Sequence, residues 1–94
     1  SKSFLTSLSN KMTENTMVTR GWYYRNSPIR DDNSIPGLIV RGPTWDTVIV
    51  EKLKYSKEKD SFSINDVHKN TMTVDVLWNE SEIETCPIEN LIVW

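Results

Sequence analysis

The sequence predicts a small all-β domain, a five-stranded antiparallel barrel with an N-terminal extension. From Met72 to Trp78, apolar and polar residues alternate with a period of two, which is typical of a half-buried strand. Other β-prone segments follow residue 37 at short intervals, separated by turn-forming residues. A chain of 94 residues suits one domain, and closing so small a sheet removes edge strands that invite aggregation.

Each element of the expected barrel follows from local composition. The expected strands are residues 38–40, 47–55, 71–78, 81–86 and 91–94, with a short pairing segment at 62–64. Gly42-Pro43 is expected to end the first strand, and residues 66–70 are expected to form a loop. Asn79-Glu80 forms a tight turn, and Pro87 to Asn90 suits one 3₁₀ turn because proline is favoured at a first helical position.

The chain divides into three parts, of which the last is the barrel. Residues 1–16 are rich in Ser, Thr and Asn, so their helix propensity is poor and we expect a flexible tail that at most docks Phe4 and Leu8. Residues 17–36 form an aromatic N-terminal extension followed by a turn-rich loop. Residues 37–94 are the barrel proper.

Charge is distributed unevenly although the net charge is only −2. Residues 1–41 carry six basic and three acidic groups, whereas residues 42–94 carry five basic and ten acidic groups. The total does not demand nucleic acid or an anionic membrane as a partner. A basic half beside an acidic half favours either self-complementarity or two different partners.

Residues that support catalysis or metal binding are scarce. Cys86 is the single cysteine and His68 the single histidine, so a zinc site, which needs about four N or S ligands, is not expected. No Ser nucleophile motif or glycine-rich phosphate loop is present. We therefore expect a non-enzyme with no cofactor and no metal. One free cysteine and no apolar membrane-length run favour an intracellular protein, nuclear or cytoplasmic.

Two motifs resemble known families. The Met72–Trp78 strand, the acidic turn and the helical turn before the last strand resemble SH3-like and Tudor-like barrels, notably the SH3-like repeats of large hybrid ubiquitin-conjugating/ligating enzymes. Residues 40–45, Val-Arg-Gly-Pro-Thr-Trp, look like the opening of Mind-bomb-type modules of ubiquitin ligases, although the usual continuation is replaced after Asp46. This resemblance implies a non-catalytic module that binds peptides, methylated side chains or substrates.

An aromatic rim is the leading candidate site. The expected barrel brings Trp45, after the first strand, and Trp78, before the tight turn, to one mouth. Aromatic faces with a carboxylate suit a methylated ammonium or guanidinium group. The full set of candidate ligand-binding residues is Trp45, Trp78, Tyr55, Asp46, Asp75 and Glu80. The alternative is that both indoles are core residues, with Trp78 continuing the apolar face of its strand.

A second surface interleaves basic and aromatic residues: Arg20, Trp22, Tyr23, Tyr24 and Arg25. Such a pattern can stack on bases while neutralising phosphates. Strand alternation would bury either Tyr23 or the pair Trp22 and Tyr24, so packing on the core and a partner surface are the competing interpretations.

These observations predict an interaction module of a larger intracellular protein that binds a peptide or methylated side chain, plausibly in the ubiquitin pathway or in chromatin. The alternatives are a nucleic-acid-binding barrel that uses the basic-aromatic segment and a structural module that docks a neighbouring domain. A protein or peptide partner is expected and a membrane is not. The sequence leaves the oligomeric state open.

Overall fold

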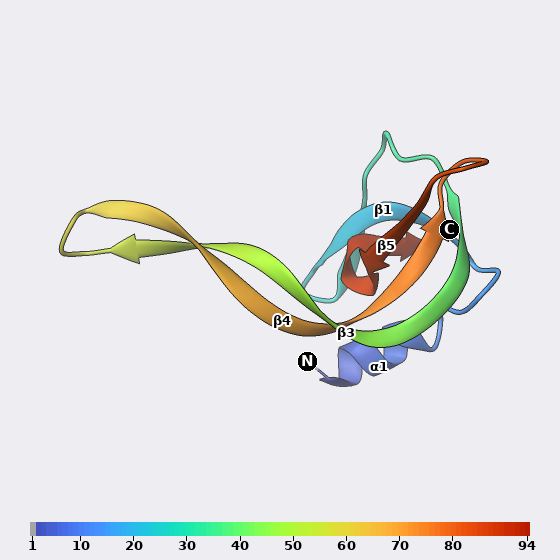
Figure 1. Cartoon of the computed structure of the whole chain (residues 1–94), viewed down its shortest axis with the longest axis horizontal. Coiled ribbons are helices and arrows are strands. Elements are labelled where there is room, and N and C mark those ends of the chain that lie inside the picture. The colour runs from blue at the N-terminus through green and yellow to red at the C-terminus, as the bar shows by residue number, and fades with distance from the viewer. Residues whose placement is uncertain (1) are drawn as a thin grey trace.

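The computed structural model describes residues 2–94 and confirms the all-β fold class. Nearly all of its regular structure is strand, with one α-helix and one 3₁₀ turn (Figure 1). The elements in chain order are α1 (Lys2–Ser9), β1 (Met17–Tyr24), β2 (Ser27–Arg30), β3 (Gly37–Ser56), β4 (Ser61–Leu77), β5 (Ile83–Pro87), η1 (Ile88–Asn90) and β6 (Leu91–Val93).

The strands form one antiparallel sheet in the order β2-β1-β3-β4-β5, with β6 paired to β1. The sheet curves around a core, and η1 lies between β5 and β6 (Figure 1). Within residues 2–94 no strand pairing joins β5 to β6, so the hydrogen-bonded ladder is open. Closure into a barrel stays a prediction.

The core fills the concave side of the curved sheet. Its buried members come from the sheet, from η1 and from the N-terminal segment: Leu8, Met12, Val18, Ile39, Val74, Val76, Cys86, Ile88 and Leu91. The apolar face predicted for residues 72–78 is confirmed for Val74 and Val76, which are buried. This core anchors the C-terminal half of β4, and the other half of β4 continues into a long hairpin with β3.

The prediction of a flexible tail over residues 1–16 is wrong for the described residues. Residues 2–9 form α1, and both Leu8 and Met12 are buried against the sheet. Their spacing of four residues places them on one side of the helical segment. Tertiary packing therefore stabilises a helix that Ser and Thr would not stabilise in isolation.

Residues 17–30 supply two strands of the sheet, β1 and β2, and residues 31–36 form a loop, as predicted. β1 pairs with β3 through Met17 and Val18, and pairs with β6 through Val18 to Arg20. Val18 is fully buried. The structural unit consequently begins well before Gly37.

The largest difference from the prediction lies in β3 and β4. Gly42-Pro43, joined by a cis peptide bond, does not end the strand; the ladder shifts register on both sides of Arg41 and then continues. Residues 66–70, predicted as a loop, belong to β4. The result is a two-stranded hairpin, residues 47–70, which we call the arm, and it projects from the body in a molecule of 50 × 28 × 23 Å (Figure 1).

The C-terminal order of strand, turn, strand, 3₁₀ turn and strand is confirmed. The Asn79 side-chain oxygen accepts the backbone N–H groups of Ser81 and Glu82, each at 3.1 Å, which holds the turn. Pro87, predicted at the first helical position, is the last residue of β5 and the N-cap of η1, one position earlier. Local chemistry suffices to specify this part of the chain.

Candidate functional site

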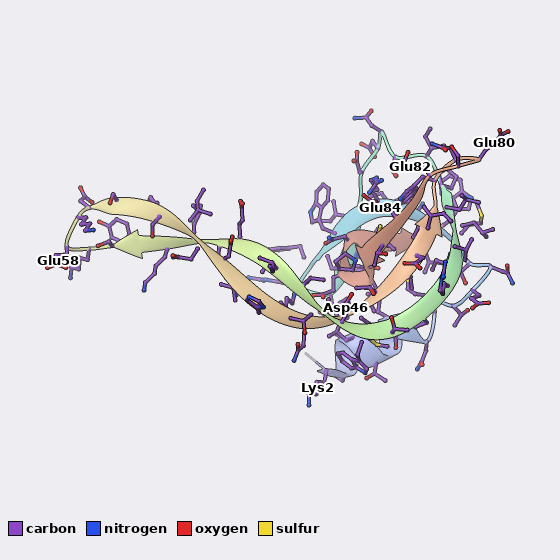
Figure 2. The ribbon with its side chains drawn as sticks, viewed as in Figure 1. Lys2, Asp46, Glu58, Glu80, Glu82 and Glu84 are labelled. Atoms are coloured by element: carbon purple, nitrogen blue, oxygen red, sulfur yellow. The ribbon has the colours of Figure 1, made fainter. Side chains whose placement is uncertain are left out.

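The structure does not bring Trp45 and Trp78 to one mouth, so the predicted aromatic rim is wrong. Trp45 pairs with Met72 at the root of the arm, whereas Trp78 follows the last residue of β4. Six residues of extended chain between Met72 and Trp78 span roughly 20 Å. In Figure 2, Asp46 lies where β3 and β4 cross beside α1, and Glu80 lies at the far end of the β4–β5 turn.

The Trp78 ring already stacks against a cationic side chain of the same chain, Arg20. The Arg20 guanidinium carbon lies 4.1 Å from the centre of the Trp78 ring, and Arg20 donates to Glu84 at 2.8 Å. Trp78 itself donates its indole N–H to the same Glu84 oxygen at 3.0 Å. The combination of ring, cation and carboxylate predicted for a ligand therefore exists here as an internal contact.

The Glu84 carboxylate is the centre of this internal network. Its Oε1 also accepts from the Cys86 thiol at 3.1 Å. The hydrogen bond from Cys86 and that from Arg20 hold the pKa of Glu84 below its ordinary value, against a small opposing effect of burial. Burial, and then the neighbouring Glu84, raise the pKa of Cys86 to about 12. The cysteine is therefore a protonated thiol rather than a nucleophile at neutral pH.

Trp45 lies in a surface cleft, which we call the Trp45 cleft. This cleft has a volume of about 490 Å³ and is lined by Lys2, Leu5, Trp45, Asp46, Thr47 and Asn70. The indole is 61% exposed. Figure 2 shows Lys2 and Asp46 on either side of this region, one at the start of α1 and one on β3. An exposed indole beside a carboxylate remains available to a ligand.

Polar contacts shape the floor of the cleft. Asp46 accepts the backbone N–H of Thr47 at 2.8 Å, and the Thr47 hydroxyl donates to the side-chain oxygen of Asn70 at 2.8 Å. Beyond Leu38, no strand pairs with the edge of β3 that faces away from β4 among residues 2–94. On that edge, the main chain beside Trp45 therefore has no strand partner among these residues, and Lys2 and Leu5 of α1 lie across the cleft from it.

The other predicted ligand residues lie elsewhere. Tyr55 is near the tip of the arm, where its hydroxyl donates to Asp60. That hydrogen bond raises the pKa of Tyr55. Asp75 is engaged by Arg41 at 3.0 Å and by the Thr85 hydroxyl at 2.7 Å. Glu80 is an exposed residue of the β4–β5 turn. None of these three lines the Trp45 cleft.

The basic-aromatic segment splits between the two faces of β1, as alternation requires. Tyr23 points inward, packs edge-on against Phe4 at 5.1 Å and donates to the Leu91 carbonyl at 2.8 Å. Burial raises the pKa of Tyr23. Trp22 and Tyr24 are 52% and 61% exposed, and Arg25 lies over the Tyr24 ring at 5.3 Å. An exposed aromatic pair remains on this strand.

Sequence reasoning missed a third surface, on the arm. Leu53 pairs with Ile64, and Tyr55 pairs with Phe62, so these four side chains share one face of the hairpin. We call them the arm face, and each is between 49% and 71% exposed. The alternation of Leu53 with Tyr55 and of Phe62 with Ile64 was a visible signal. In the sequence it does not differ from an ordinary strand pattern, because the sequence does not show that the arm lacks a third layer.

Other classes of site find little support in the described residues. Residues 2–94 contain no group of three or more His, Cys, Asp or Glu side chains placed to hold a metal ion. No helix in that range has both the length and the apolar character needed to cross a membrane. Comparison of the chain with protein-family models, curated proteins and solved structures finds no match. The resemblance to SH3-like and Tudor-like modules stays a prediction.

Proposed function

We propose that this chain is a non-catalytic interaction module that binds an extended peptide carrying a basic side chain in the Trp45 cleft. The observation that carries the proposal is the 61% exposed indole of Trp45 beside Asp46 in the Trp45 cleft. The other indole of the predicted rim, Trp78, already holds Arg20. The proposed ligand is therefore still a basic side chain, and the proposed site contains only Trp45 of the two indoles of the predicted rim.

Two kinds of contact support this ligand. A peptide strand added to the unpaired edge of β3 would place its side chains about 5 Å from their cross-strand neighbours, Trp45 among them. A lysine or arginine there would lie against the indole, with the Asp46 carboxylate supplying opposite charge. One cation–π contact at an exposed site contributes about 0.5–1 kcal/mol, so the peptide backbone must supply much of the affinity.

The test is an NMR titration with peptides that contain lysine or arginine, unmodified and methylated. We expect chemical shift changes confined to residues around Trp45 and along the edge of β3. Trp45→Ala should weaken binding by roughly two- to fivefold, the equivalent of one cation–π contact, with unchanged circular dichroism, because the side chain is mostly exposed. Trp22→Ala, which removes an indole of similar exposure from another strand, is the matched control and should bind like the wild type.

Three outcomes would decide against parts of the proposal. Shift changes remote from Trp45, or equal binding by Trp45→Ala, would reject the site. Equal binding of methylated and unmodified peptides would reject recognition of the modification while leaving peptide binding intact. A role in the ubiquitin pathway or chromatin, inside the cell, extends the family resemblance and would require a bound peptide from such a protein.

Nucleic-acid binding is the second candidate, because Trp22 and Tyr24 are exposed beside Arg25. Two nearby arginines are already engaged within the chain, since Arg20 forms an ion pair with Glu84 and Arg30 donates to the Val93 carbonyl at 3.1 Å. Oligonucleotide binding that weakens steeply with salt and is lost in Trp22→Ala would favour it. No binding at low salt would dismiss it.

A further inference from the structure

We propose that a second groove, between α1 and the part of the sheet formed by β1, β2 and β6, binds a small amphiphilic carboxylate of the fatty-acid class. We call it the α1 groove; one wall contains Phe4, Leu8 and Lys11, and the other contains Tyr23, Arg30 and Ile92. Its volume of about 360 Å³ lies within the range of small-molecule sites. It shares no lining residue with the Trp45 cleft, so the proposal is independent of peptide binding there.

The α1 wall follows from the spacing of its residues. Phe4, Leu8 and Lys11 are separated by four and three residues, so they lie on one side of the helical segment. The backbone N–H groups of Lys11 and Met12 donate to the Leu8 carbonyl at 3.0 and 3.1 Å, which continues the helical turn beyond Ser9. Two apolar side chains and, at the end of this stripe, one ammonium group therefore line the groove.

The sheet wall is held by contacts within the chain. Tyr23 donates its hydroxyl to the Leu91 carbonyl at 2.8 Å, and its ring meets that of Phe4 edge-on at 5.1 Å, which joins the two walls. Ile92 packs over Gly21, where an added Cβ would clash with the Ile92 side chain. The apolar surface of the groove is thus formed before any ligand binds, as is usual for small-molecule sites.

The charges of the groove favour an anion. Lys11 and Arg30 line it and no aspartate or glutamate does, although the whole chain carries more acidic than basic residues. Neither cation is paired with a carboxylate within residues 2–94. Arg30 donates one N–H to the Val93 carbonyl at 3.1 Å, which leaves other donors of its guanidinium for a ligand. Glu14 and Asp31, the acids nearest in sequence, do not line the groove. A carboxylate would therefore form charge-assisted hydrogen bonds there without a competing acid.

A small apolar acid suits this groove better than a peptide strand does. An extended peptide binds an exposed sheet edge through main-chain hydrogen bonds. β2 is an edge strand, and its Pro28, which also lines the groove, has no N–H to donate. Recognition in the groove therefore depends on apolar packing against Leu8 and Ile92 and on the two cations. A hydrocarbon chain with a terminal carboxylate satisfies both requirements.

The experiment is an NMR titration of the whole chain with octanoate, followed through the methyl signals of Leu8 and Ile92. Two ligand controls separate the two requirements. Acetate lacks the hydrocarbon chain, and octyltrimethylammonium has the chain with a positive charge. We expect saturable shift changes at both residues with octanoate, much weaker changes with either control, and no change at the Trp45 indole.

Charge reversal in the groove separates the carboxylate contact from apolar packing. Lys11→Glu should weaken octanoate binding by about fivefold, because it removes an attraction and adds a repulsion, and should strengthen binding of octyltrimethylammonium. Lys57→Glu makes the same charge change at the tip of the arm and should bind both ligands like the wild type. Both lysines are exposed, so circular dichroism is expected to be unchanged in both variants.

The proposal is overturned if octanoate and octyltrimethylammonium bind equally, if Lys11→Glu and Lys57→Glu behave alike, or if the shift changes lie outside the groove. A peptide of acidic and apolar residues that shifts the signals of Leu8 and Ile92 when octanoate does not would also overturn it, and would assign the groove to a protein partner. None of these outcomes changes the prediction for the Trp45 cleft, because the two sites are lined by different residues.

Discussion

The guanidinium of Arg20 stacks on the indole of Trp78 at 4.1 Å and thereby joins β1 to the end of β4. The two residues are far apart in sequence, and the stack exists only because the sheet curves. Glu84 completes the contact by accepting from both side chains. A group of residues suited to binding the cation of a ligand is thus engaged in an internal contact that links β1 to the end of β4.

Replacing Arg20 by methionine is expected to lower the free energy of unfolding by about 1 kcal/mol. The residue loses one cation–π contact and one ion pair, and its side chain is 44% exposed, so solvent weakens both. Urea denaturation followed by circular dichroism measures the change. Arg25→Met is the control, because Arg25 stacks on the exposed Tyr24 at 5.3 Å and should cost less. Equal losses would contradict a special role for the Arg20–Trp78 stack.

Stability should decrease in acid partly through Glu84. Because its pKa in the folded protein lies below the ordinary value of 4.5, the folded state binds fewer protons than the unfolded state around that pH. The contribution is therefore present above pH 4.5 and is lost as pH falls through the folded pKa. Urea midpoints measured across this range should fall less in Glu84→Gln than in the wild type. Glu80→Gln, in an exposed turn, should follow the wild type, and identical curves for all three would refute the assignment.

Cys86 should resist alkylation in the native state. With its pKa raised from 9.0 to about 12, the thiolate fraction at neutral pH falls on the order of a thousandfold, and burial adds a steric barrier. Iodoacetamide labelling followed by mass spectrometry should proceed only as fast as the protein opens. A Ser81→Cys variant, exposed in the β4–β5 turn, provides a rapidly labelled reference in the same chain. Equal labelling rates at both positions would show that Cys86 is accessible.

Met12→Ala should destabilise the protein by about 2–4 kcal/mol. Met12 is fully buried, and truncating a buried methionine removes transfer free energy and leaves a cavity. Lys11→Ala, at the adjacent exposed position, should change the free energy of unfolding by less than about 0.5 kcal/mol. Chemical denaturation of both variants measures the difference. A negligible effect of Met12→Ala would restore the interpretation of residues 1–16 as a tail.

The parts that sequence reasoning predicted correctly are those in which neighbouring residues carry the signal. The apolar face of β4, a turn that includes Asn79 and a 3₁₀ turn after Pro87 are local features and are confirmed, although residues 78–82 connect the strands in place of the predicted two-residue turn. The predicted docking of Phe4 and Leu8 is confirmed, but the helix and the burial of Met12 were missed because the propensity of its serines and threonines argues against a helix, while the decisive contacts are with distant strands.

The candidate site was harder to predict because it depends on strand register. Gly42-Pro43 reads locally as a strand breaker, yet the ladder accommodates it with register shifts and extends to Ser56. That continuation carries Tyr55 to the tip of an arm and leaves Trp45 at its root, roughly 20 Å along β4 from Trp78. No property of the individual residues distinguishes this arrangement from a closed mouth.

The amino-acid sequence alone thus determined that the protein is all-β, where its last strands and turns lie, and which aromatic and acidic side chains are available for binding. Only the tertiary structure decided which of these side chains are engaged in internal contacts and which remain exposed. Arg20 fills the face of Trp78, while Trp45 and the arm face remain exposed. The reason is physical: strand periodicity is set by neighbours along the chain, whereas exposure and pairing are set by residues brought together from distant positions.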